Sequence, residues 1–144
     1  QEGCRIITGG KKMGGELSEG AFLEPTLIAA TNEVRIAQEE IFGPVATVIK
    51  FKTEAEVIAL ANDSEYGLAG AVWTTNINRA LRVAKAVKTG RMWVNCFNRL
   101  PAGAPFGGYK SSGIGRENHK MMLAAYTQVK NIYISMREER EGMY

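Results

Sequence analysis

The sequence is poor in the residues that cross-link a chain or bind metals: it has two Cys and one His in 144 residues. Two thiols, Cys4 and Cys96, are too few for a disulfide framework, and together with His119 they do not make up the ligands of a zinc site. We therefore expect no metal, and two reduced thiols in a cytoplasmic protein.

Long apolar runs and a strong excess of one charge are also missing. No run approaches the ~18 apolar residues that a membrane-spanning helix needs, and the polar opening Gln1-Glu2-Gly3 is unlike a signal peptide. Lys and Arg total 18 against 15 Asp and Glu, and the basic residues are scattered. We expect neither a membrane nor a nucleic-acid partner.

What is present is ordinary globular composition, with 45% apolar and 23% charged residues. This composition excludes a disordered segment. A chain of this length can bury roughly 68–70% of the surface that it exposes when unfolded. We therefore expect a hydrophobic core that needs no disulfide bonds or metal ions to stabilise it.

The order of apolar runs predicts the fold class. Runs rich in β-branched residues at 45–51, 69–74 and 92–95 predict strands, and helical patterns at 53–61 and 77–87 separate them. Thr53 followed by Glu56 is a capping-box signature. The alternation predicts an α/β fold with a parallel βαβαβ sheet, whose ligands would bind beyond the carboxyl ends of the strands.

Other elements flank this unit. Segments 4–8 and 22–29 predict short strands, 117–125 a helix, 126–135 a strand, and 137–144 a solvated tail. Between the last strand of the unit and that helix lies a glycine-rich loop at about 96–116. Loops longer than ~12–15 residues are functional or disordered, and its Pro and aromatic residues favour an ordered, functional loop.

Two segments hold the candidate chemistry. In 38–45 (QEEIFGPV), the adjacent Glu39 and Glu40 point to opposite sides of an extended chain, so one could reach a ligand hydroxyl. Segment 105–117 (PFGGYKSSGIGRE) has neither the dinucleotide fingerprint nor the phosphate-binding P-loop spacing. On physical grounds alone, an ordinary surface loop with exposed acids is the favoured interpretation of the first segment, and a loop that lets backbones pack closely is the structural interpretation of the second.

Cys96 lies at the carboxyl end of a predicted strand, where a nucleophile could sit. A nucleophilic thiol needs a base or an electropositive setting, and the spacing predicts no such partner. We expect Cys96 to be buried and inert, and His119 to lie on a helix surface.

Four motifs together carry a resemblance to the NAD(P)-dependent aldehyde dehydrogenases. They are QEEIFGPV at 38–45, YGLA at 66–69, WVN at 93–95 and PFGGYKSSGIGRE at 105–117, in the family's order. From about residue 1 to 135 the chain is similar to the C-terminal third of that family, and 115–123 resembles the bacterial acetaldehyde dehydrogenase branch. The resemblance implies that 1–125 is the C-terminal part of a catalytic domain. It also implies that 126–136 is an oligomerisation strand and 137–144 a tail.

The resemblance implies an enzyme that oxidises an aldehyde to a carboxylic acid with NAD or NADP, through a thioester. The family's nucleophilic cysteine, general-base glutamate and Rossmann domain precede the 38–45 motif. We therefore expect a fragment that is inactive alone and that forms homo-oligomers through 126–135. A non-catalytic structural or assembly protein that uses an exposed sheet edge is the alternative.

Residue by residue, the resemblance assigns three kinds of site. Glu40 matches the glutamate that binds the nicotinamide-ribose hydroxyls, and Phe42 the aromatic beside the nicotinamide. Glu117 matches a glutamate that supports proton relay. The residues that match the aldehyde tunnel are Asn98, Arg99, Leu100 and Phe106, of which Arg99 departs from an apolar lining.

Overall fold

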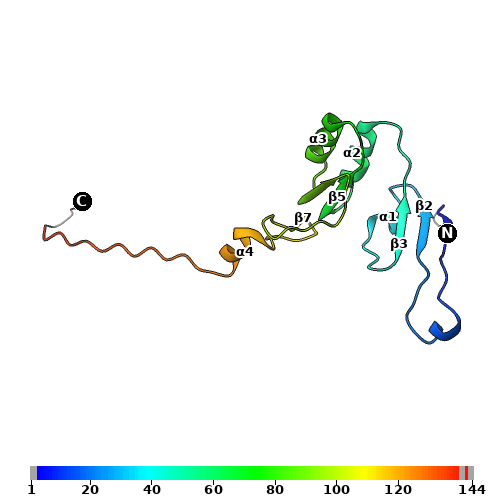
Figure 1. Ribbon diagram of the computed structural model, residues 1–144, viewed down its shortest axis with the longest axis horizontal. Coiled ribbons are helices and arrows are strands. Elements are labelled where there is room, and N and C mark those ends of the chain that lie inside the picture. Colours follow the sequence, from blue (N-terminus) through cyan, green and yellow to red (C-terminus); the bar gives the residue numbers. More distant parts are fainter. Residues whose placement is uncertain (1–2, 140–141, 143–144) are drawn as a thin grey trace.

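The computed structural model describes residues 3–139 and 142, and the chain is elongated (Figure 1). Its elements are β1 (Arg5–Thr8), the 3-10 turn η1 (Gly15–Leu17), β2 (Thr26–Ala29), α1 (Arg35–Gln38), β3 (Val45–Val48), α2 (Glu54–Asn62), β4 (Tyr66–Gly67), β5 (Ala69–Val72), α3 (Ile77–Ala86), β6 (Arg91–Val94), β7 (Tyr109–Lys110) and α4 (His119–Ala125). The helices and strands expected between residues 4 and 125 all occur, with ends that differ by a few residues.

The described strands form three small sheets. β2 pairs with β3 in parallel and with β1 antiparallel; β5 pairs with β6 in parallel, and β4 with β7 antiparallel. The α/β class and the parallel β5–α3–β6 unit agree with the prediction. The expected single parallel sheet through β3, β5 and β6 is not formed: β3 pairs with the upstream strand β2, and β5 and β6 pair in a separate sheet. Spacing along the chain does not reveal which strands become neighbours.

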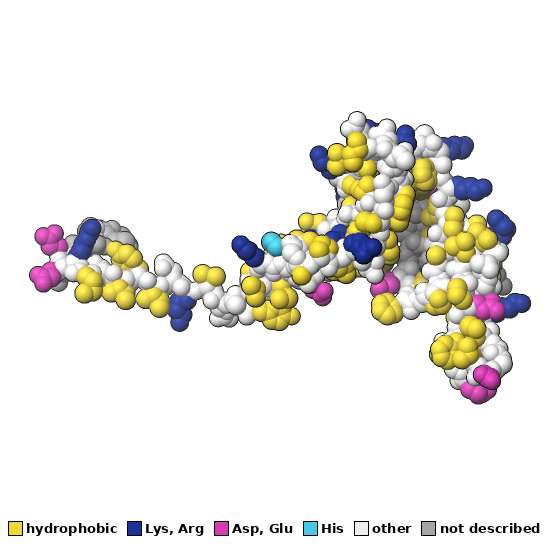
Figure 2. Space-filling view, viewed as in Figure 1, with side chains coloured by type: hydrophobic (Ala, Val, Ile, Leu, Met, Phe, Trp, Pro, Cys, Tyr) yellow, Lys and Arg dark blue, Asp and Glu magenta, His cyan; other side chains and the backbone are white. Residues whose placement is uncertain are grey.

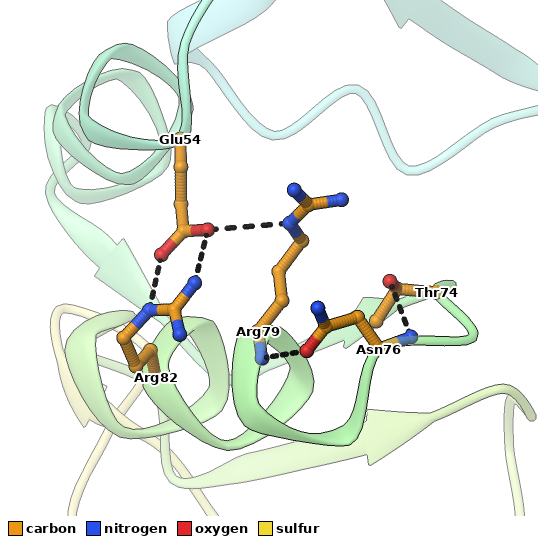
Figure 3. A network of polar contacts seen from close by, with 5 residues as sticks. All are labelled: Glu54, Thr74, Asn76, Arg79 and Arg82. Atoms are coloured by element: carbon orange, nitrogen blue, oxygen red, sulfur yellow. Dashed lines mark hydrogen bonds and ion pairs between the residues drawn. The ribbon is translucent and has the colours of Figure 1, made fainter.

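Side chains fix the two main helices at their starts. At α2, Thr53 Oγ1 accepts from the Glu56 amide at 3.1 Å, and the Glu56 carboxylate accepts from the Thr53 amide at 3.3 Å. This is the predicted capping box. At α3, Asn76 Oδ1 accepts from the Arg79 amide at 3.0 Å. Glu54 then joins the helices by ion pairs to Arg82 at 2.8 Å and to Arg79 at 3.3 Å (Figure 3).

The prediction of a self-contained hydrophobic core is wrong, because few apolar side chains of the described residues are buried. Among the described residues, the buried apolar ones are Ile28, Ala80, Val83 and Trp93. The accessible surface is 11932 Å², against about 7,300 Å² for a folded monomer of this mass. Figure 2 shows hydrophobic side chains spread over the outside of the body and along the extended C-terminal segment. Exposed apolar surface of this extent is typical of surfaces that contact other protein.

The strand expected at 126–135 is not formed. Residues 127–137 run as extended chain away from the body (Figure 1), with no strand partner in the described part of the molecule. The physical reason is that a strand is defined by a ladder, and no neighbouring strand offers one here. In the expected tail, 140–141 and 143–144 lie outside the described residues. Within the described residues, none of the helices has the length and hydropathy to cross a bilayer.

Candidate active-site segments

The first candidate segment follows α1 and separates the two adjacent acids. Arg35 Nε donates to Glu39 Oε1 at 2.7 Å, one helical turn away. The hydrogen bond from the Arg35 guanidinium lowers the pKa of the Glu39 carboxyl. Glu40 is exposed, and no carboxylate–cation contact involves it in the described part of the chain. Of the two predicted acids, Glu40 is therefore the one available to a ligand.

Phe42 is the most unusual residue of this segment. Its φ is +52°, in the left-handed region, and its side chain is 94% exposed. A bulky residue at positive φ is strained, and such strain concentrates at ligand sites and switches. The backbone thus presents an open aromatic face two residues beyond Glu40.

The second candidate segment brings two predicted residues together. The Phe106 amide donates to the Glu117 carbonyl at 3.0 Å, and the Glu117 amide donates to the Phe106 carbonyl at 2.7 Å. This antiparallel bridge closes the second half of the glycine-rich loop. Between the loop and α4 lies an open hollow of about 550 Å³, whose lining includes Phe106, Glu117, Met122 and Tyr126.

Three of the four predicted tunnel residues, Asn98, Arg99 and Leu100, lie on a separate turn after β6. Trp93 Nε1 and Arg91 Nη2 both donate to the Arg99 carbonyl oxygen, at 2.9 and 2.8 Å. Trp93 is only 6% exposed and packs against Phe97 with ring centroids 5.1 Å apart. The turn that carries Asn98, Arg99 and Leu100 is therefore fixed to the strand at one backbone oxygen.

The structure thus joins some of the predicted site residues and leaves others apart. Phe106 and Glu117 share one hollow; Glu40 lies at a different, smaller one, together with Arg35, Ile36, Glu39 and Ile41. Trp93 and Arg91 are functional candidates that sequence reasoning missed. A tryptophan on a strand signals packing, and its bond to the Arg99 carbonyl has no local sequence signal.

The thiols and the histidine form no catalytic cluster. Cys96 is half-buried and free, as is Cys4. His119 is exposed at the start of α4, as the sequence predicts, and its backbone amide donates to the Ala102 carbonyl at 3.1 Å. Across residues 3–139 and 142, no cluster of three or more His, Cys, Asp or Glu could hold a metal ion.

The α/β architecture agrees with the comparisons. The model of the aldehyde dehydrogenase family matches residues 1–132. The chain belongs to the aldehyde dehydrogenase family.

Its similarity to individual members is high over a short part of their length. It is 53% identical to the acetaldehyde dehydrogenase of Pseudomonas aeruginosa, covering 100% of this chain and 29% of that protein. Apo betaine aldehyde dehydrogenase from Staphylococcus aureus matches with a TM-score of 0.91 and 46% identity, over 99% of this chain and 29% of that one. The same enzyme with NAD+ matches with a TM-score of 0.82 and 51% identity, over 87% and 25%. The chain thus spans less than a third of these relatives.

Proposed function

We propose that this chain is part of an NAD(P)-dependent aldehyde dehydrogenase that oxidises an aldehyde to a carboxylic acid. Within that enzyme it supplies residues that position the cofactor and face the aldehyde. The observation that carries the proposal is the division of labour between Glu39 and Glu40. Arg35 binds Glu39, while Glu40 is left exposed beside the strained, open ring of Phe42.

The chemistry of these two side chains fits a nicotinamide nucleoside. A carboxylate accepts hydrogen bonds from two vicinal ribose hydroxyls, and charge-assisted bonds of this kind are strong. The Phe42 ring offers a flat apolar surface to an aromatic base. The cofactor, when bound, accepts the hydride that leaves the aldehyde carbon. Glu40 and Phe42 would hold the nucleotide in the orientation that this transfer needs.

The Phe106–Glu117 bridge and the Asn98–Leu100 turn would serve the aldehyde side. Glu117 lines the open hollow, and its exposed carboxylate can pass a proton to or from a neighbouring group. Phe106, Asn98, Arg99 and Leu100 would line the approach of the aldehyde. Arg99 adds a positive charge there.

The overall reaction balances as aldehyde, NAD(P)+ and water giving carboxylic acid, NAD(P)H and a proton. A thiolate elsewhere in the enzyme adds to the carbonyl carbon, two electrons leave as hydride, and water hydrolyses the resulting thioester. The 144 residues alone are inactive on this proposal. The test is aldehyde-dependent NAD(P)H formation by the protein that contains this chain. Its absence with a panel of aldehydes, or activity of the 144 residues that Cys96→Ala abolishes, would overturn the proposal.

The extended segment supports assembly into a homo-oligomer through 126–135. Val129, Ile132 and Ile134 lie along it and are exposed, and unpaired strand edges pair readily with other chains. The same feature would serve a non-catalytic assembly protein, which is the second candidate function.

The free thiols of Cys4 and Cys96 fit a cytoplasmic location of the enzyme.

A further inference from the structure

The carboxyl end of α2 has three consecutive carbonyl oxygens, those of Asn62, Asp63 and Ser64, that all accept hydrogen bonds from distant side chains. The last carbonyls of a helix have no partner within the helix and carry its negative dipole end. Such oxygens attract amide and ammonium donors. Here the donors come from both candidate segments.

From the first segment comes Gln38, and from the chain just before α1 comes Asn32. Gln38 Nε2 donates to the Asp63 carbonyl at 3.0 Å and to the Asn32 carbonyl at 2.7 Å. Asn32, only 7% exposed, donates through Nδ2 to the Asp63 carbonyl at 3.2 Å and to Asp63 Oδ2 at 3.0 Å. Gln38 is the last residue of α1. These bonds therefore anchor the chain two residues before Glu40.

From the second segment comes Lys110. Its Nζ donates to the Asn62 carbonyl at 2.9 Å and to the Ser64 carbonyl at 2.7 Å, on either side of Asp63. Its φ of +54° is strained for a residue with a side chain. The neighbouring Ser111 and Ser112 reinforce the junction: the Ser111 amide donates to the Glu65 carbonyl at 2.9 Å, and Ser112 Oγ accepts from the Gly67 amide at 3.0 Å.

We propose that Lys110 and Gln38 are positioning residues that hold the Glu40–Phe42 segment and the Phe106–Glu117 segment in fixed relation through the carboxyl end of α2. Neither side chain needs to touch substrate or cofactor. The proposal rests on the proposed function, in which one segment orients the nicotinamide and the other faces the reacting aldehyde. Hydride transfer depends on that relation, since a displacement of about 1 Å can cost 10²-fold in rate.

The kinetic test uses the full-length enzyme and the variants Lys110→Met, Gln38→Leu and their combination. Each single variant should lower the single-turnover rate of NAD(P)H formation by roughly 10- to 100-fold. The aldehyde KM should change by less than about twofold, because substrate contacts remain. The double variant should be little slower than the slower single one, since both act through one junction. Lys110→Arg, which keeps the charge and donors, should recover part of the rate.

The matched control is Lys88→Met, which removes the same charge from an exposed side chain. The Lys88 backbone amide donates to Asn62 Oδ1, so this control lies beside the junction. Its rate should stay near that of the parent. Multiplicative losses in the double variant, or an equal loss in Lys88→Met, would overturn the positioning role.

A readout without catalysis separates this proposal from the proposed function. Hydrogen exchange of the amides at 39–42 should speed up in Lys110→Met, although Lys110 contacts none of them directly, and should stay unchanged in Lys88→Met. Unchanged exchange in Lys110→Met would reject the junction even in an active enzyme. Faster exchange in a protein that oxidises no aldehyde would support the junction and reject the proposed function.

Discussion

Phe106 and Glu117 exchange two backbone hydrogen bonds across an antiparallel bridge, so the two ends of the 105–117 segment are held together. This bridge keeps Glu117 in the lining of the hollow beside α4. The position of the Glu117 backbone is thus set by bonds that do not involve its side chain. Substitutions of the side chain should therefore change chemistry while the loop keeps its shape.

Glu117→Gln in the full-length enzyme should slow a proton-transfer step by about 10²-fold, near the low end for general acid–base groups. The amide keeps the size of the side chain and removes its ability to take up a proton. The pH dependence of kcat should change shape, and Glu117→Asp should restore part of it. A pH–rate profile that Glu117→Gln leaves unchanged would exclude the relay role.

Trp93→Phe should loosen the turn that carries Asn98–Leu100. It removes one of the two donors to the Arg99 carbonyl while it keeps an aromatic ring, and should cost about 1 kcal/mol of unfolding free energy. The aldehyde KM should rise, whereas NAD(P) affinity should stay constant. Trp73→Phe, at a side chain 63% exposed, is the control. Equal effects of the two variants would contradict a specific role for Trp93.

Glu54 should make stability depend on pH. The hydrogen bond from Arg82 is the largest cause that lowers the pKa of Glu54 from 4.5, with smaller contributions from the charge of Arg82 and from Arg79 (Figure 3). A carboxyl with a lowered folded-state pKa stabilises the fold above its unfolded pKa, and this contribution is lost as the pH falls through the folded-state value. Thermal unfolding of Glu54→Gln should therefore vary less with pH below about 4.5 than the parent does.

The matched control for Glu54→Gln is Glu16→Gln, because Glu16 is exposed in the turn η1. This variant should keep the parent's pH dependence. If Glu54→Gln tracks the parent throughout the acid range, the ion pairs between α2 and α3 do not contribute to stability.

Ile132→Pro should weaken assembly of the full-length protein. Proline removes a backbone donor from any ladder that 126–135 forms with another chain. Light scattering should show a shift toward smaller species, and Glu138→Pro, beyond the segment, should not. An oligomer that Ile132→Pro leaves unchanged would place the interface elsewhere.

The elements of the fold were predictable because their signals are local. The Thr53–Glu56 capping box and the apolar stripe of α3 can be read from neighbouring residues, and both are found. The pairing of β2 with β3 was not predictable, because strand neighbours are chosen by competition among distant segments. The small size of the core was not predictable for a similar reason. Composition gives the amount of apolar surface in a chain but does not show whether the same chain or another one covers it.

The features of the candidate site likewise fall into those that the sequence predicts and those that depend on the tertiary fold. The motif around Glu40 and Phe42 identified the segment, but which acid is free depends on Arg35, and the positive φ of Phe42 has no composition signal. Lys110 stood within a recognised motif, yet its bonds to the Asn62 and Ser64 carbonyls join residues far apart in the sequence. Contacts of this kind follow from the tertiary fold.

The most direct test of the account compares Glu40→Ala with Glu39→Ala in the full-length enzyme, by single-turnover NAD(P)H formation. The two residues are adjacent carboxylates, and Glu39 is the one that Arg35 binds. Loss of a charge-assisted contact costs roughly 1.5–3 kcal/mol, which is about a 10- to 150-fold slower hydride transfer for Glu40→Ala. Glu39→Ala should remain close to the parent rate. Equal rates for the two variants, or a larger loss in Glu39→Ala, would contradict the assignment of the cofactor-binding role to Glu40.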